Sequence, residues 1–254
     1  MGIMEGKVVI ITGGGQNIGK GVAIAFAKEG ASLVITDVVE EVLVAAKEEF
    51  ERDYGIKVLA LIADGSAEEA VKSAIQKTVE MFGRIDVIIN NAHRRTTQAP
   101  LENYTEEDFM INFRTGPLAA FFYMKHALPY LKETKGSVIN LGSGGHQNGM
   151  LEAGAYNTSK AATSGLTRSA ANEWGKYGIN VNELCPVVMT PAFEEWIKKY
   201  PEMYQRTVIE RTAMRRVGDS ENDIGRICVF LASADAKYLT AQCINADGGN
   251  IIRP

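Results

Sequence analysis

Tyr156 and Lys160 stand four residues apart in the segment AYNTSK, so on a helix their side chains project from one face. A lysine ammonium beside a tyrosine stabilises the phenolate, which makes the hydroxyl a better proton donor and acceptor near neutral pH. Taken alone this spacing is common, and two side chains on an exposed helix face are the alternative explanation. Ser143 ends a short apolar run thirteen residues before Tyr156, and its hydroxyl can hold a carbonyl oxygen. Together the three side chains predict proton transfer at an alcohol or carbonyl group.

A glycine-rich segment follows the first apolar run of the chain. Gly13, Gly14, Gly15 and Gly19 stand between that run and a segment of helical period. Free backbone N–H groups at a helix N-terminus favour an anion, and glycines let the chain turn tightly against a pyrophosphate. The alternative is a sharp strand-to-helix corner with no ligand. The segment predicts a phosphate site.

Asp37 ends the second apolar run, eighteen residues after Gly19. A carboxylate there can accept hydrogen bonds from both ribose hydroxyls of an adenosine, and it repels a 2′-phosphate. No arginine or lysine occurs in residues 13–19 or 38–41 to hold such a phosphate. The pattern therefore favours NAD over NADP. A helix N-cap is the alternative role for Asp37.

Short β-branched runs alternate with longer segments of helical period along the chain. Strands are predicted at 7–12, 32–37, 57–64, 85–90, 137–141, 179–184 and 242–245. These runs are nearly all apolar, so helices should cover both faces of a parallel sheet, which is the doubly wound α/β arrangement. An eight-stranded barrel has a similar length, but the glycine cluster after the first strand favours the open sheet. The helix after that cluster should end at Gly30, and Ser66 and Glu69 should form a capping box at a later helix.

Composition limits the class of protein. The 254 residues are 46% hydrophobic and 23% charged, with a formal net charge of −4. This balance is typical of a soluble globular domain, and the acidic charge argues against a nucleic-acid or membrane partner. Three cysteines without CxxC spacing are expected to be reduced thiols in a cytoplasmic protein, and the apolar runs are too short to span a bilayer. One domain is predicted for residues 1–254, with 187–217 as a lid or insertion.

These motifs together make the chain similar to the short-chain dehydrogenase/reductase family over essentially its whole length. The resemblance depends on Thr12-Gly13, Asn17-Ile18-Gly19, Asp64, Asn90-Asn91-Ala92, Asn112, Ser143, Tyr156, Lys160, Pro186 and Thr190. It implies a single-domain, Rossmann-like, doubly wound sheet of about seven parallel strands flanked by helices. It also implies hydride transfer between a nicotinamide and a carbinol carbon, without a required metal.

The resemblance implies a role for each matching residue. Tyr156 transfers the proton, Lys160 assists it and binds the nicotinamide ribose, Ser143 orients the substrate oxygen, and Asn112 supports a proton relay through water. Besides Tyr156 and Lys160, the expected cofactor contacts are Gly13, Gly15, Asn17, Ile18, Gly19, Asp37, Asp64, Asn91, Ala92, Pro186 and Thr190. Family members usually form tetramers or dimers through the helices that carry Asn112 and Tyr156, so a homo-oligomer is expected.

The sequence departs from the family pattern at several positions. Asn17 replaces a glycine, and asparagine tolerates a left-handed backbone better than other non-glycine residues. His93 also replaces a glycine, and we expect it either to pack structurally or to shape the substrate mouth with Arg94 and Arg95. Val187 replaces a glycine and should crowd the pocket. The segment before Asn112 is about four residues shorter than usual, which removes roughly one helical turn.

The function predicted from the sequence is NAD(H)-dependent interconversion of a secondary alcohol and a ketone. Expected substrate contacts are Ser143, Gly144, His146, Val187 and Trp196, with a solvent-facing loop as the alternative for His146. Phe193, Trp196 and Tyr204 favour a bulky hydrophobic substrate such as a hydroxysteroid. A 3-oxoacyl thioester or a sugar or polyol are alternative substrates, and a catalytically silent NAD-binding scaffold is the alternative from another class.

Overall fold

The computed structural model describes residues 2–252, apart from the side chains of residues 192 and 207. In this part of the chain seven parallel strands form one sheet in the order β3-β2-β1-β4-β5-β6-β7. The strands are β1 (Val8–Thr12), β2 (Ser32–Asp37), β3 (Val58–Ile62), β4 (Val87–Asn90), β5 (Ser137–Leu141), β6 (Asn180–Pro186) and β7 (Cys243–Ala246). Each predicted strand is therefore confirmed, with its ends within two residues.

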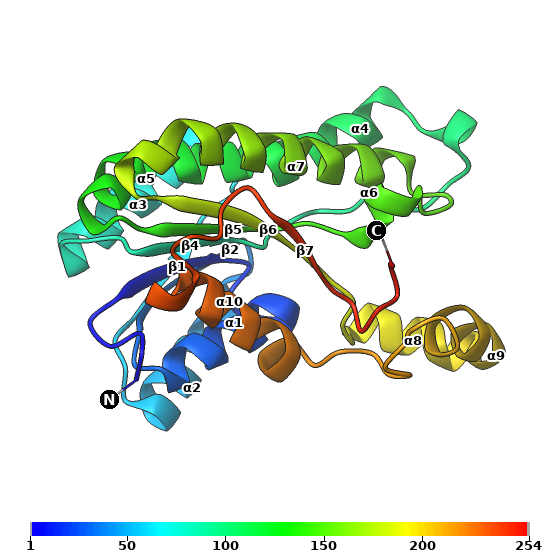
Figure 1. Ribbon diagram of the computed structural model, residues 1–254, viewed down its shortest axis with the longest axis horizontal. Helices are drawn as coiled ribbons and strands as arrows, with labels where there is room; N and C mark the ends of the chain where they lie inside the picture. The colour runs from blue at the N-terminus through cyan, green and yellow to red at the C-terminus, as the bar shows by residue number, and fades with distance from the viewer. Residues whose placement is uncertain (1, 253–254) are drawn as a thin grey trace.

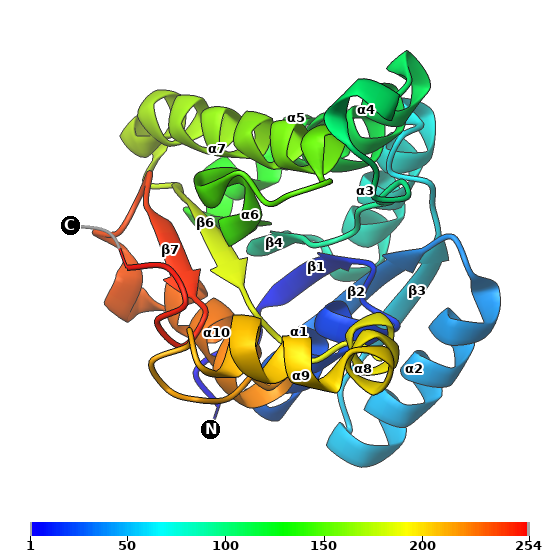
Figure 2. The same cartoon turned by 90° about the vertical axis from the view of Figure 1, so that its right-hand side faces the viewer.

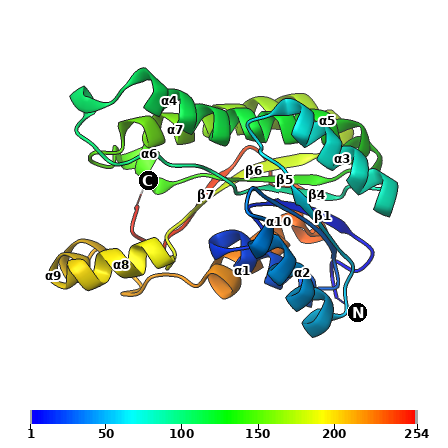
Figure 3. The same ribbon diagram turned by 180° about the vertical axis from the view of Figure 1, so that it is seen from behind.

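Helices cover both faces of the sheet, as the apolar strands required (Figure 1). One face carries α1 (Asn17–Lys28), α2 (Glu40–Tyr54) and α10 (Arg226–Ala232). The other carries α3 (Glu68–Phe82), α4 (Glu106–Phe113), α5 (Ala119–Thr134) and α7 (Gly154–Trp174), and the view from behind gives the same three layers (Figure 3). The doubly wound α/β class is confirmed.

Two apolar layers, one on each side of the sheet, form the core. Alternate residues of one strand face opposite layers, so Val9 and Ile11 of β1 pack with α1 whereas Val8 and Ile10 pack with α5. Phe26 and Tyr123 are among the largest buried side chains of the two layers. A strand buried on both faces has no polar alternation, which explains why these runs were recognisable in the sequence.

The strand order reverses between β1 and β4, which are neighbours in the sheet but not consecutive strands of the chain. In an open α/β sheet such a switch point leaves a crevice at the carboxyl ends of the strands. The loops after β1, β4 and β5 emerge at this end. So do α6 (Gly144–Asn148) and α8 (Pro191–Lys199), as Figures 1 and 2 show. The sheet topology therefore gathers the predicted site residues at one edge.

The predicted insertion 187–217 contains α8, α9 (Pro201–Tyr204) and a π-helical turn, Gln205–Ile209. It contributes no strand to the sheet within the described residues, and a single bridge between Val188 and Gly218 closes its base. The described residues of this segment form no strand, as expected, and its role as a lid or insertion stays a prediction. Among residues 2–252, no helix is long and apolar enough to cross a membrane.

Candidate active site

The glycine-rich turn after β1 has the shape that a pyrophosphate site needs. Gly13 (φ +64°) and Asn17 (φ +49°) are both left-handed, which confirms the backbone role expected of Asn17. A side chain on Gly19 would place its Cβ 2.0 Å from the carbonyl oxygen of Gly13, so only glycine fits there. No side chain caps α1, which leaves the N–H groups of its first turn to a ligand. The residues present therefore fit a dinucleotide phosphate.

Hydrogen bonds tie this turn to the end of β4. The Thr12 hydroxyl accepts hydrogen bonds from the backbone N–H groups of Asn91 and Ala92, both at 2.9 Å. The Asn91 side chain donates in return to the carbonyl of Thr12 at 2.8 Å. These bonds cross the switch point and fix the two walls of the crevice relative to each other.

Two carboxylates lie at the next strand ends. Asp37 Oδ1 accepts from the backbone N–H groups of Val38 (2.8 Å) and Val39 (3.2 Å), and Oδ2 has no hydrogen bond among the described residues. Asp37 can therefore accept hydrogen bonds from its own loop through Oδ1 and from a ribose through Oδ2. The alternative role as a helix N-cap is wrong, because Val39 is the N-cap of α2 and no side chain caps that helix. Asp64 accepts from the backbone and hydroxyl of Ser66. The predicted capping box is wrong, because Ser66 bonds to Asp64 and α3 starts at Glu68 without a side-chain cap.

One cleft of about 1240 Å³ joins these elements. Its wall includes most of the predicted cofactor contacts: Gly13, Asn17, Ile18, Asp37, Asp64, Asn91, Ala92, Tyr156, Lys160, Pro186 and Thr190. Gly15 and Gly19 are not on the wall. They allow close packing behind it, against Val42 and the Gly13 carbonyl respectively. The structure thus places the predicted cofactor residues around one cavity.

Tyr156 and Lys160 lie on α7, one turn apart, and line the cleft. Lys160 is only 6% exposed, and its Nζ donates to the carbonyl of Leu141 at 2.6 Å and lies 5.7 Å from the centre of the Tyr156 ring. A second cation is close, since the Arg95 guanidinium carbon lies 4.7 Å from the same ring centre. Two positively charged side chains therefore lie close to the Tyr156 ring.

His93 contacts the same tyrosine. Its ring centre lies 5.2 Å from that of Tyr156, and Nε2 lies 3.1 Å from the carbonyl oxygen of Asn112, to which its Nε2–H tautomer donates. Burial, with a smaller effect from the charge of Lys160, lowers the pKa of His93 from 6.5 to about 3. The imidazole is therefore neutral near pH 7. His93 also lies on the cleft wall, so the residue both packs and shapes the cleft.

Asn112 lies on α4, whose N-terminus has a complete capping box between Thr105 and Asp108. The Asn112 side chain is fully buried, and its Nδ2 donates to Thr96 Oγ1 (2.8 Å) and to the Asp108 carbonyl (2.9 Å). A π-helical turn, Arg114–Leu118, follows at once. The backbone carbonyl of Asn112 lies 3.1 Å from Nε2 of His93, and the role of Asn112 in a proton relay stays a prediction.

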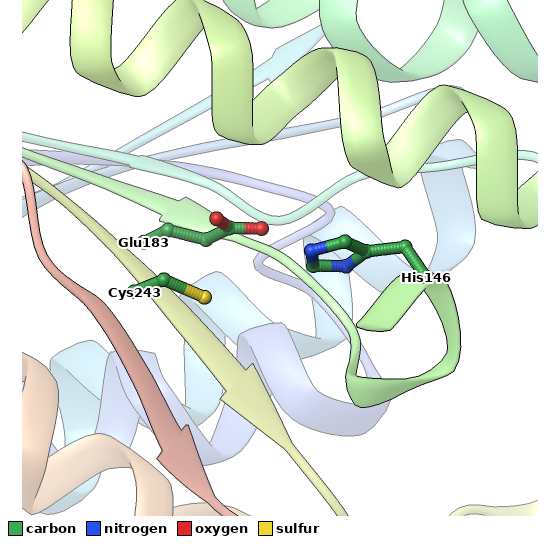
Figure 4. A group of neighbouring side chains, drawn as sticks. All are labelled: His146, Glu183 and Cys243. Atoms are coloured by element: carbon green, nitrogen blue, oxygen red, sulfur yellow. The ribbon is translucent and has the colours of Figure 1, made fainter. Parts of the chain in front are cut away.

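None of the predicted substrate contacts is part of the cleft wall. Ser143 is the N-cap of α6 and accepts from the Gly145 N–H at 3.1 Å, and Gly144, Val187 and Trp196 are likewise absent from the wall. His146 is neither solvent-facing nor turned to the cleft, because its ring points inward to Ser164 and Glu183 (Figure 4). The wall includes instead Arg94, Arg95, Glu107, Ile111 and Arg114. The substrate roles of the five residues stay predictions.

Sequence reasoning missed Glu183, a carboxylate in the buried strand β6 that is 1% exposed. Its Oε2 accepts from the Ser164 hydroxyl at 2.6 Å, and a side chain on Gly142 would meet Oε1 at 2.1 Å. Glu183 therefore lies directly beneath the residue before Ser143. The available signal was a glutamate inside an otherwise uncharged strand.

Sequence comparisons identify relatives across the whole chain. The family model described as enoyl-(acyl carrier protein) reductase matches residues 13–250. A 12α-hydroxysteroid dehydrogenase from a Clostridium species is 48% identical, with 100% of each chain covered.

Solved structures confirm the fold and differ in cofactor. An NAD⁺-bound xylitol dehydrogenase has a TM-score of 0.90 at 29% identity, with 97% of this chain and 99% of that chain covered. L-Sorbose reductase from Gluconobacter frateurii, solved with NADPH and L-sorbose, has a TM-score of 0.93 at 25% identity over 100% of each chain. A nicotinamide cofactor is common to both.

Proposed function

Because this chain belongs to the short-chain dehydrogenase/reductase family, whose members interconvert alcohols and ketones, we propose that it is an NAD(H)-dependent hydroxysteroid dehydrogenase. The observation that carries the proposal is the shared cleft. Tyr156 and Lys160 lie on one wall, and the glycine turn with Asp37 lies on another. Proton transfer and dinucleotide binding are thus available in one cavity.

Asp37 supports NAD as the cofactor. Its free Oδ2 can accept from a ribose hydroxyl, whereas a 2′-phosphate at the same place would meet a negative charge. The phosphates would lie at the uncapped N-terminus of α1, and Asp64, Asn91 and Thr190 line the remaining wall. The structural relatives bind either NAD⁺ or NADPH, so this preference is inferred from Asp37.

Within the chain, Tyr156 is the group that moves the proton. In alcohol oxidation its phenolate takes the hydroxyl proton as the carbonyl forms, and in reduction the phenol returns it. Lys160 and Arg95 stabilise the phenolate, and Ser143 orients the substrate oxygen. A bound nicotinamide supplies the hydride acceptor or donor at the carbinol carbon.

Two observations support a steroid as the substrate class. The first is the relative at 48% identity, which acts on a 12α-hydroxysteroid. The second is the aromatic cluster of the insertion. Trp196 stacks on Phe193 at 5.6 Å and 21°, and Tyr204 meets Phe193 edge-on at 6.0 Å. None of these rings is part of the buried core, so they can cover a rigid apolar ring system as a lid.

We also propose a cytoplasmic homo-oligomer, a tetramer or a dimer. Phe113 on α4 and Phe121 on α5 are each 41% exposed at the helical layer where the family usually associates. Burying exposed aromatic side chains of this kind is a typical driving force for association.

The test is a panel of hydroxysteroids, a polyol and a 3-oxoacyl thioester, assayed with NAD(H) and NADP(H). We expect hydroxysteroid turnover with NAD⁺ and a loss of at least a thousandfold in kcat for Tyr156→Phe. Tyr177→Phe is the matched control, since Tyr177 lies outside the cleft beside Lys132. Turnover confined to the polyol or the thioester would reject a steroid as the substrate class. Unchanged turnover in Tyr156→Phe would reject the mechanism.

A further inference from the structure

A cluster of possible metal ligands lies beside the Ser143 loop, and none of its residues lines the cleft. His146 comes from α6, Glu183 from β6 and Cys243 from β7, and their ligand atoms all lie within 4.8 Å of one another (Figure 4). Glu183 and Cys243 are register partners on adjacent parallel strands, so both side chains point to the same face of the sheet. The fold itself therefore gathers an imidazole, a carboxylate and a thiol.

Glu183 has little to compensate its charge. Among the described residues it forms no ion pair, and its hydrogen bonds come from the Ser164 hydroxyl (2.6 Å) and, weakly, from the Cys185 thiol (3.8 Å). Buried carboxylates are normally paired with a cation or bind a metal, because burial removes the solvation of the charge. A cation at this cluster would supply the missing charge.

We propose that His146, Glu183 and Cys243 form a binding site for a borderline-soft divalent cation of the Zn²⁺ class. Imidazole nitrogen, carboxylate oxygen and thiolate sulfur are the three ligand types that Zn²⁺ takes in proteins. Ser164 bonds Oε2 of Glu183 and so leaves Oε1 for the cation, as an outer hydrogen bond does in known metal sites. Water completes the coordination, with an entry path along the exposed Cys243.

The ligand distances require only a small closure. Metal–ligand bonds of about 2.0–2.3 Å in a tetrahedron give ligand separations of about 3.3–3.8 Å. Atoms within 4.8 Å of one another must therefore approach by about 1.5 Å at most. His146 is the ligand able to move, since α6 has five residues and Gly149 (φ +67°) follows it. Its Nδ1 is buried without a hydrogen-bond partner, and among the described residues the ring hydrogen-bonds to Ser164 through Nε2.

Occupancy of this site would act on the loop that carries Ser143. Ser143 is the N-cap of α6, and His146 lies three residues further along the same helix. A cation bound to β6, β7 and α6 would anchor that helix to the sheet. We therefore assign the site a stabilising role beside the catalytic loop, independent of the proposed substrate.

Co²⁺ titration of tag-free, cofactor-free protein tests the site, because Co²⁺ replaces Zn²⁺ and absorbs when bound to a thiolate. We expect a near-ultraviolet charge-transfer band that saturates at one equivalent and disappears when Zn²⁺ is added. Cys243→Ser should abolish the band, and His146→Gln should weaken Co²⁺ binding at least tenfold. Cys228→Ser is the matched control, since Cys228 is a free thiol buried in α10, and this variant should titrate like the parent.

Thermal unfolding with and without Zn²⁺ gives a second readout that needs neither cofactor nor substrate. Zn²⁺ should raise the Tm of the parent and of Cys228→Ser, and leave that of Cys243→Ser unchanged. The absence of a saturable one-to-one band would overturn the proposal, as would a band that persists in Cys243→Ser. Since turnover is not measured, neither result depends on the proposed dehydrogenase activity.

Discussion

The imidazole of His93 changes the electrostatics around Tyr156 without adding a charge. It lies between the tyrosine ring and the Asn112 carbonyl, and a side chain on Gly116 would meet it at 3.0 Å. Burial and the charges of Lys160 and Arg95 lower the pKa of this imidazole, whereas its hydrogen bond to the Asn112 carbonyl raises it. The neutral ring therefore adds no third positive charge beside Tyr156.

This shift makes His93 a source of acid sensitivity. The pKa of His93 is about 3 in the folded chain and 6.5 in the unfolded chain, so the unfolded state binds more protons between these values. The contribution of His93 to stability is therefore fully present above pH 6.5 and is lost as the pH falls toward 3. Between pH 7.5 and pH 5 we expect His93 to account for up to about 2 kcal/mol of lost unfolding free energy.

Urea unfolding at the two pH values measures this effect. His93→Asn should lose about 2 kcal/mol less than the parent between pH 7.5 and pH 5. An identical loss in both proteins would mean that His93 is protonated in the folded chain.

Asp37 sets the cofactor preference in our proposal. Asp37→Ala removes the ribose acceptor, and a hydrogen bond to a charged group contributes about 1.5–3 kcal/mol. We therefore expect NADH to bind about 10–100-fold more weakly, with NADPH binding unchanged or tighter. Nicotinamide fluorescence titration measures both. Asp53→Ala, at the exposed end of α2, is the control and should leave both affinities unchanged. Tighter NADPH than NADH binding in the parent would contradict the assignment.

At the scale of elements, the local sequence pattern was sufficient to predict a strand or turn where a single physical requirement determines the residue type. The central strands β1, β4 and β5 are buried along their whole length, and such strands are mainly apolar, which made them predictable. Asn17 occupies the left-handed position that its amide side chain indicated. The predicted capping box failed because Ser66 had a competing partner, Asp64, two residues earlier. A short polar side chain has several local partners, and the sequence does not rank them.

The insertion is the element on which the substrate class depends. In α8, Trp196 stacks on Phe193 and lies 6.0 Å from Tyr200, outside the core. If this face closes over a steroid, Trp196→Ala removes an apolar contact of roughly 1.5–2 kcal/mol. KM for the hydroxysteroid should rise about 10–30-fold, while kcat/KM for a small secondary alcohol stays within about twofold.

Steady-state kinetics with the hydroxysteroid and with the small alcohol tests whether Trp196 covers the substrate. Tyr238→Ala removes a fully exposed aromatic ring outside the insertion and should leave both substrates unaffected. Equal losses on the steroid and the small alcohol would show that Trp196 supports the fold of α8 instead of contacting the substrate.

At the scale of the whole molecule, the unpredictable features are those that join distant segments. His146, Ser164, Glu183 and Cys243 are spread over almost a hundred residues, and only the β5-β6-β7 order places them together. The orientation of His146 follows from that packing, which no local sequence pattern shows, and its contact with a substrate stays a prediction. Most of the predicted cofactor residues line one cleft because many of them follow strand ends, and a parallel sheet puts all such ends at one edge.

The C-terminal segment gives a direct test of such a long-range contact. Asp247 accepts from the backbone N–H groups of Gly249 and Ile251, and this turn lays Ile251 against Gly144, where a Cβ would meet its Cδ1 at 2.3 Å. Gly144→Ala should therefore lower the unfolding free energy by about 1 kcal/mol through overpacking. In an Ile251→Ala background the same substitution should cost almost nothing, because the clashing methyl group is gone.

Urea unfolding of the four proteins in this double-mutant cycle measures the coupling, which we expect to be about 0.5–1 kcal/mol. The kcat of each protein shows whether the contact reaches Ser143, the neighbour of Gly144. If the segment positions the catalytic loop, kcat should fall in Gly144→Ala and recover in the double variant. The same unfolding penalty in both backgrounds would mean that the end of the chain does not rest on the loop in solution, and the Ser143 loop would then depend on α6 and the sheet alone.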